Sequence, residues 1–160
     1  YRIYIKHKDS KRPVTKRVVS LRKFENKLGL NDRKIYDQFV KRIERFRDQL
    51  VNFVKTEIDN GKIIHVYGAS TKGNTLLQFY NLNANLIKAA VERNPDKWGK
   101  KTVGTLIPII SEEESRKQKP DYFLILPWHF LSEFREREKE FFTNGGKFIV
   151  PLPKFKIIGQ

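Results

Sequence analysis

Residues 63–74 read IIHVYGASTKGN, and this stretch decides the fold class. A short apolar run with β-branched residues is typical of a buried strand, and here it leads into a turn with glycine, small hydroxyl residues and lysine. A strand that delivers such a turn into a helix can aim backbone N–H groups at a phosphate. The turn lacks the middle glycine of the dinucleotide fingerprint and the spacing of a Walker loop. It therefore predicts a βα unit without identifying a ligand.

Four further apolar runs alternate with helical patterns after this unit. We expect strands at residues 86–91, 106–110, 122–126 and 148–150, and helices over residues 72–80, after the capping residue Ser111, and over residues 131–143. Strands that alternate with helices indicate a parallel sheet covered on both faces. The sequence thus predicts an α/β fold, with a Rossmann-like, doubly wound, mostly parallel sheet of five strands in the order 3-2-1-4-5. This domain is expected to occupy residues 61–160.

A helical arm is expected before the sheet. Residues 1–32 predict a linker strand over residues 2–6, a basic loop, and a short helix from Ser20 that stops near Gly29.

Residues 33–60 predict one long helix that packs on the domain. Its cap is Asn31 or Asp32, and Gly61 ends it. Apolar residues recur at steps of three and four along one face: Ile35, Phe39, Ile43, Phe46, Leu50 and Phe53. Such a stripe favours core packing or an interdomain strut, with a coiled-coil dimer as the alternative.

Composition limits the class of protein. The net charge is +15, but residues 1–62 carry 18 Lys and Arg against 8 Asp and Glu, whereas residues 63–160 carry 15 against 10. Because the excess lies away from the glycine turn, a nucleic-acid partner is not favoured. Cysteine is absent, which excludes disulfides and thiolate metal ligands. No apolar span is long enough for a membrane helix, so we expect a cytoplasmic protein. Methionine is absent too, and we interpret the chain as part of a longer protein.

The turn after the first strand is the first candidate ligand site. In an open parallel sheet, ligands bind beyond the carboxyl ends of the strands. Small residues would allow a tight turn and close approach of the backbone, while Lys72 and the hydroxyl and amide side chains would bind phosphate or sugar oxygens. The predicted residues are Gly68, Ala69, Ser70, Thr71, Lys72, Gly73, Asn74 and Thr75. The alternative is that any tight βα turn favours such residues for structural reasons.

The ends of two other strands complete this candidate site. Glu92 follows Gly68 by 24 residues, close to the spacing at which an acid holds a ribose in dinucleotide folds. Trp128 follows the fourth strand and is expected either to stack on a base or to pack against another domain. The predicted residues at these ends are Glu92, Arg93, Asn94, Pro127, Trp128 and His129.

No catalytic or metal site is expected in the chain. His7, His65 and His129 lie far apart, and His65 falls within the first strand, where a core residue is favoured. The acids at residues 112–114 and 133–140 fall on expected helices, where solvated faces are favoured over paired catalysts.

Several segments together resemble a known family. They are YGASTKGNTLL (residues 67–77), VERNPDKWG (91–99), GTLIPI (104–109), PDY (120–122), LPWH (126–129) and GGKFIVPLP (145–153). In order and spacing they resemble the C-terminal domain of the S-adenosylmethionine-dependent sugar C-methyltransferases. The resemblance covers nearly the whole chain from residue 33. Two positions depart from the family pattern, which often has aspartate in place of Glu92 and asparagine in place of His129.

The resemblance implies a role in holding substrate. In that family, a zinc-binding segment and a middle domain that binds S-adenosylmethionine precede this domain, and the C-terminal domain anchors a nucleotide diphosphate-sugar, dTDP- or UDP-linked. Catalytic residues then lie upstream of Tyr1, and the cofactor belongs to the intact protein and not to this chain. The implied reaction removes a proton beside a sugar ketone, and the resulting enolate attacks the cofactor's methyl group.

Two other functions stay open from the residues alone. One is a self-contained NAD(P)-binding oxidoreductase domain that uses Glu92 on the ribose. The other is a nucleic-acid-binding module that uses the basic arm from Lys6 to Arg47.

Overall fold

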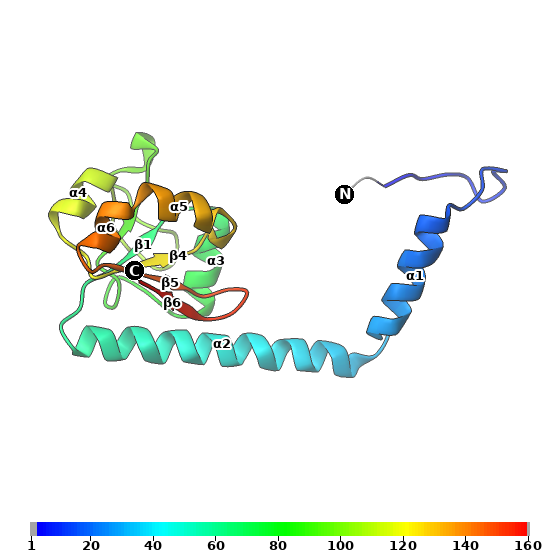
Figure 1. Ribbon diagram of the computed structural model, residues 1–160, viewed down its shortest axis with the longest axis horizontal. Helices are drawn as coiled ribbons and strands as arrows, with labels where there is room; N and C mark the ends of the chain where they lie inside the picture. Colours follow the sequence, from blue (N-terminus) through cyan, green and yellow to red (C-terminus); the bar gives the residue numbers. More distant parts are fainter. Residues whose placement is uncertain (1–2, 160) are drawn as a thin grey trace. The chain divides into compact units, whose positions relative to one another are not determined.

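One mixed sheet of six strands organises the larger part of the computed structural model, which describes residues 3–159 (Figure 1). The strand order is β3-β2-β1-β4-β5-β6, and the first five of these strands run parallel. The strands are β1 (Ile64–Tyr67), β2 (Ala89–Val91), β3 (Ile109–Ile110), β4 (Tyr122–Ile125), β5 (Lys147–Val150) and β6 (Lys156–Ile158). The α/β class and the order 3-2-1-4-5 are thereby confirmed.

The prediction of five strands was wrong by one. Strand β6 pairs antiparallel with β5, with Ile157 opposite Ile149. Its three residues follow a segment with two prolines, and so short a run carries too little alternation to indicate a strand. It becomes a strand because β5 would otherwise present an unpaired edge.

Helices cover both faces of the sheet (Figure 1). Alternate strand residues face opposite sides, so Leu124 joins a cluster with Leu50 and Leu77, whereas Phe123 joins another with Phe134. We call these the aliphatic face and the aromatic face. Helices α2 (Arg33–Asp59) and α3 (Thr71–Phe79) contribute to the aliphatic face, and α5 (Leu131–Arg137) and α6 (Lys139–Thr143) contribute to the aromatic face. On the aromatic side, α4 (Glu112–Lys117) places Ser115 against His65 of β1.

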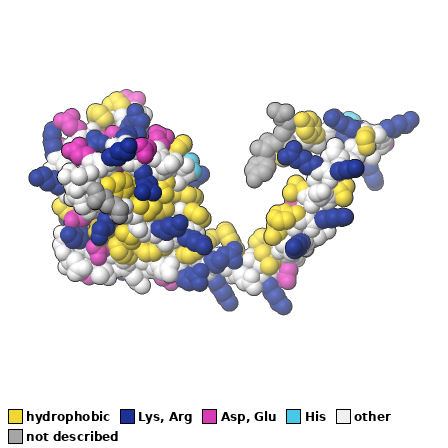
Figure 2. Space-filling view, in the orientation of Figure 1, with side chains coloured by type: hydrophobic (Ala, Val, Ile, Leu, Met, Phe, Trp, Pro, Cys, Tyr) yellow, Lys and Arg dark blue, Asp and Glu magenta, His cyan; other side chains and the backbone are white. Residues whose placement is uncertain are grey.

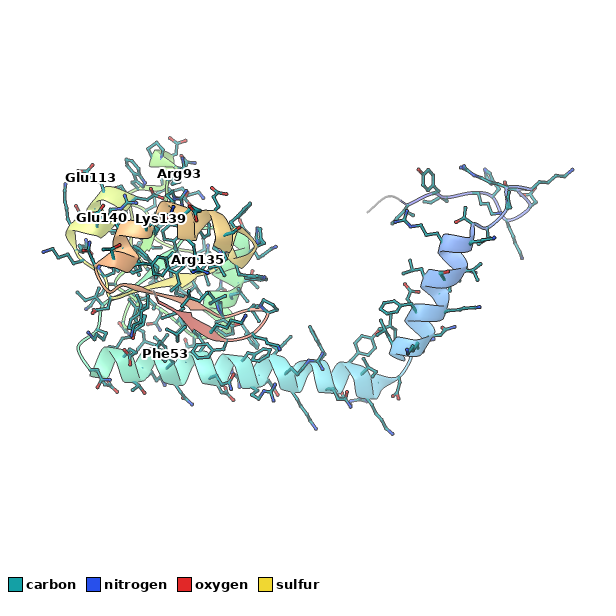
Figure 3. All side chains as sticks on the ribbon, in the orientation of Figure 1. Phe53, Arg93, Glu113, Arg135, Lys139 and Glu140 are labelled. Carbon is teal, nitrogen blue, oxygen red and sulfur yellow. The ribbon has the colours of Figure 1, made fainter. Side chains whose placement is uncertain are left out.

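The long helix α2 has the expected cap. Asp32 Oδ1 accepts a hydrogen bond from the N–H of Lys34 at 2.9 Å, and Gly61 follows the helix with a positive φ of 78°. In the second half of α2 the apolar stripe packs on the sheet, and Leu50 there is fully buried. Phe53 faces the sheet and packs edge-on against the ring of Tyr122, with the two ring centres 5.5 Å apart (Figure 3).

The described residues divide into two compact units, one up to Arg42 and one from Ile43 onward. In the first, α1 (Lys16–Leu28) begins after Thr15, earlier than the expected Ser20, and ends at Gly29 as predicted. No strand forms within residues 3–6, and Arg2 lies outside the described residues. Figure 2 shows Lys and Arg side chains interspersed with hydrophobic ones along this unit. The proposed division at residues 32 and 60 stays a prediction. Within residues 3–159, no helix is both long and apolar enough to cross a membrane.

Candidate functional site

A cleft of about 290 Å³ lies at the carboxyl ends of β1, β2 and β4. This is the place where ligands bind in open parallel sheets. Five of the predicted site residues line it: Gly68, Ser70, Glu92, Arg93 and Pro127. Its other lining residues come from strand ends, from α4 and α5, and from the 3₁₀ turn before α5: Tyr67, Val91, Glu112, Phe130, Glu133, Phe134 and Arg137. The structure therefore brings three separate segments of the prediction to one cleft.

The glycine turn has the local geometry that the sequence predicted. Gly68 adopts a φ of 93°, a conformation that other residues rarely adopt, and its N–H donates to the carbonyl of Val91 at 2.8 Å. Ser70 caps α3 by accepting from the N–H of Gly73 at 3.0 Å. A Cβ on Gly73 would lie 2.8 Å from Leu126 Cδ1, so glycine lets the helix approach the end of β4. The turn thus places Gly68 and Ser70 in the wall of the cleft and the first residues of α3 beside it.

Glu92 links the two strand ends, and its carboxylate is fully occupied by protein groups. Oε1 accepts from the N–H groups of Arg93 and Asn94, while Oε2 accepts from the N–H of Ala69 and from Lys97 Nζ, all at 3.0–3.1 Å. Burial alone would raise the pKa of Glu92, but these hydrogen bonds outweigh it and lower the pKa. Since a carboxylate has about four lone-pair sites, no acceptor is left for a ribose hydroxyl.

Lys72, Trp128 and His129 lie beside the cleft and do not line it. Lys72 Nζ is 5.9 Å from the centre of the Trp128 ring, a cation–π distance that joins the glycine turn to the segment after β4. His129 packs against Phe130, with ring centres 4.4 Å apart, and Phe130 lines the cleft. These contacts form an aromatic rim around one side of the cleft.

The remaining predicted residues have local roles in the structure. Thr75 donates back to the carbonyl of Thr71 at 3.4 Å, and both side chains are exposed. Asn94 caps a short 3₁₀ turn by accepting from the N–H of Asp96 at 3.0 Å. The Oδ1 atom of Asn74 is buried and has no hydrogen-bond partner among the described residues. Their contact with a ligand stays a prediction.

An ionic cluster on the aromatic face was missed by the sequence analysis. Tyr67 OH donates to Glu138 Oε1 at 2.7 Å and accepts from Arg137 Nη2 at 2.6 Å. Arg116 Nη2 donates to the same Glu138 oxygen at 2.9 Å, and Arg137 Nη2 lies 3.3 Å from Glu112 Oε1. We call these five residues the tyrosine cluster. It closes the cleft on the α4 and α5 side, because three of its members line the cleft.

The tyrosine cluster corrects, for Glu112 and Glu138, the expectation that the acids of residues 112–114 and 133–140 form solvated faces; the other acids of these ranges are exposed as expected. Glu138 is only 3% exposed, and its φ of −102° interrupts the single helix expected over residues 131–143, giving α5 and α6. The interruption follows from the packing, since the Glu138 carboxylate binds Tyr67 and Arg116 beneath the helices. Burial, followed by the hydrogen bond to Glu138, raises the pKa of Tyr67. A tyrosine at the end of the first strand was the one sequence signal for this cluster.

His65 is a core residue, as the sequence indicated. It is fully buried in β1, and its Nδ1 lies 2.9 Å from Ser115 Oγ. Burial lowers the pKa of His65 to about 4, so the ring is neutral at physiological pH. It belongs to the packing of the aromatic face and does not reach the cleft.

Two comparisons with known proteins agree on the family. The family described as the C-methyltransferase C-terminal domain matches residues 1–153. The C-methyltransferase NovU of Streptomyces niveus is 37% identical over 134 residues, which is 84% of this chain and 32% of that protein. The chain therefore spans about a third of the length of this relative. From the match over nearly its whole length, we conclude that the chain belongs to the family of C-methyltransferase C-terminal domains.

Proposed function

We propose that this chain holds a nucleotide diphosphate-sugar, dTDP- or UDP-linked, for methylation at carbon by other domains of the same enzyme. The observation that carries the proposal is the cleft itself. It joins the glycine turn, the segment after β2 and the segment after β4 in a member of the C-methyltransferase family. We assign the fold to the Rossmann-like type as part of this proposal.

The glycine turn would receive the diphosphate. The first N–H groups of a helix have no intrahelical acceptor. In α3 these groups belong to Thr71 and Lys72, which directly follow the glycine turn. The Lys72 ammonium lies over Trp128 and adds a positive charge at the same place. Together these groups offer an anion both directed donors and charge.

Aromatic contacts are needed besides the phosphate contacts. Three charge-assisted hydrogen bonds at about 1.5–3 kcal/mol each give roughly 5–9 kcal/mol. Loss of the ligand's translational and rotational freedom costs about 4–15 kcal/mol, so the diphosphate alone would bind weakly. Trp128 and Phe130 offer the rings on which a pyrimidine base would stack. We therefore expect the base on the aromatic rim and the sugar toward the partner domain.

The residues of the cleft do not fit the methyl donor or a dinucleotide. Both carry an adenosine, whose ribose hydroxyls are commonly bound by a free acid after the second strand, and the carboxylate of Glu92 is already saturated. We assign S-adenosylmethionine to no residue of this chain, and place it with an upstream domain, as we do the zinc site. The oxidoreductase alternative loses its main argument for the same reason, and no observation favours the nucleic-acid alternative.

Calorimetry with dTDP and UDP tests the proposal. Replacing Lys72 by alanine should weaken binding by about 10- to 100-fold, because one charge-assisted contact to phosphate is lost. Lys88→Ala is the matched control, since Lys88 is exposed at the amino end of β2, at the opposite edge of the sheet. Equal affinities of the two variants, or no binding of either nucleotide at millimolar concentration, would contradict the proposal.

A further inference from the structure

The cations that line the cleft differ in part from those that the sequence suggested. Lys72 stands beside the cleft, while Arg93 and Arg137 are the Lys or Arg residues that line it within the described chain. Arg93, labelled in Figure 3, lies exposed after β2. Arg137 lies at the end of α5, with a side chain that is 26% exposed. Its position in the cleft was not predicted.

The guanidinium of Arg137 is held in one orientation. Nε and Nη2 donate to Tyr67 OH at 3.0 and 2.6 Å, and Nη2 also contacts Glu112. The group lies over the rings of Tyr67 and Phe134, at 5.4 and 5.2 Å from their centres. Two of its three nitrogens are thus engaged with the tyrosine cluster. A planar cation fixed in this way loses little entropy when it binds a further acceptor.

The third nitrogen has a weak partner. Within the described residues, Nη1 of Arg137 has one ionic contact, to Glu133 Oε1 at 3.9 Å. The Glu133 side chain is 61% exposed, and pairs of this kind contribute little to stability. An incoming anion could therefore displace the Glu133 carboxylate at small cost.

The charges of the tyrosine cluster balance without Glu133. Arg116 and Arg137 carry two positive charges, and Glu112 and Glu138 carry two negative charges. Glu133, on the cleft wall, is an additional negative charge that the buried cluster does not require. Its carboxylate occupies the position in which an anionic ligand would meet Nη1.

We propose that Nη1 of Arg137 donates a hydrogen bond to a phosphate oxygen of the nucleotide-sugar's diphosphate, in place of Glu133, which turns to solvent. The inference rests on the proposed function and adds a binding residue to it. Arginine suits this role because its planar guanidinium matches the geometry of phosphate oxygens. Binding of the neutral nucleoside should then be independent of Glu133.

Two glutamates of α5 test the displacement. Glu133→Gln should tighten dTDP binding by about three- to fivefold in calorimetry, because a negative charge leaves the phosphate position. Glu136→Gln is the matched control, since Glu136 loses the same charge on the same helix but pairs with Lys139 outside the cleft. Thymidine, which lacks phosphate, should bind both variants equally.

A second pair of variants separates binding from packing. Arg137→Lys keeps the charge but replaces the planar fork by a single nitrogen, which cannot reach Tyr67 and a phosphate in the guanidinium's geometry, so dTDP affinity should fall by about tenfold. Tyr67→Phe removes the hydroxyl that holds Nε and Nη2 but leaves the guanidinium, and should cost stability with a smaller loss of affinity. Thermal unfolding of both variants measures their loss of stability, which is then compared with their loss of dTDP affinity.

Each outcome decides the inference. Two results together support it: dTDP binds more tightly to Glu133→Gln but not to Glu136→Gln, and Arg137→Lys loses more dTDP affinity than its loss of stability explains. Equal affinities of Glu133→Gln and Glu136→Gln, or affinity that follows stability in both Arg137→Lys and Tyr67→Phe, would overturn it. If Lys72→Ala still weakens dTDP binding in that case, the proposed function stands without Arg137. If the unchanged protein binds no dTDP, both proposals fail.

Discussion

The two faces of the sheet are built by different means. The aliphatic face consists of side chains such as Leu50, Leu77 and Leu124, which are fully or almost fully buried. The aromatic face combines phenylalanine rings with a buried histidine and the tyrosine cluster. An aliphatic core tolerates rearrangement because its contacts have no direction, whereas buried ionic groups need each of their partners. The comparison indicates that the aromatic face is the more sensitive one, and it is also the face that closes the cleft.

The largest effect is expected from removing the acid at the centre of the tyrosine cluster. Glu138→Ala should lower the free energy of unfolding by about 3 kcal/mol or more, because Arg116 and Arg137 lose their buried counter-charge. Glu140→Ala is the control two residues further along the chain, on α6, where an exposed acid should change stability by less than about 0.5 kcal/mol. Urea unfolding measures both. Similar values for the two variants would mean that the ionic cluster does not stabilise this face.

The second effect is a loss of stability in acid that depends on His65. The pKa of His65 is about 4 in the folded protein and about 6.5 in the unfolded chain, so between these values the unfolded chain binds a proton that the folded protein does not. Stability should therefore fall as the pH drops from 6.5 to 4, by about 3 kcal/mol from this residue. Urea unfolding of His65→Gln over the same range should show a shallower dependence. Parallel curves for the two proteins would contradict the assignment.

The smallest effect is expected on the aliphatic face, at the helix that carries the glycine turn. Gly73→Ala places a Cβ 2.8 Å from Leu126 Cδ1 and 3.1 Å from Ser70 Oγ, and should cost about 1–3 kcal/mol in urea unfolding. Gly145→Ala tests strain without crowding, because that glycine has a φ of 85° and open space around it. If Gly73→Ala were stabilising, as in an uncrowded helix, the close approach of α3 to the end of β4 would be wrong.

Local signals explain the features that were predicted correctly. A cap depends on residues two or three apart, so Asp32 and Ser111 indicated helix starts that the structure has. Gly29 likewise ended α1 where expected. The parallel order of five strands follows from short strands that alternate with helices, and this order brought Gly68 and Glu92 to one cleft.

Features that depend on distant partners were missed. Strand β6 exists because of β5, and its own three residues carry no clear pattern. The break at Glu138 exists because the Tyr67 hydroxyl, 71 residues earlier, donates a hydrogen bond to the Glu138 carboxylate beneath the helices. Glu92 was identified from its spacing, but only the fold shows that the carboxylate binds Ala69 and Lys97.

The sequence alone determined the α/β class, the glycine turn and the resemblance to the sugar C-methyltransferases, since each of these is written in short segments with local geometry. The tertiary structure decided which side chains meet at the cleft. It turned Glu92 inward, placed Lys72 beside the cleft and brought Arg137 into it. These outcomes depend on contacts between residues far apart in the chain. The free energy of such contacts cannot be inferred from a short segment of sequence.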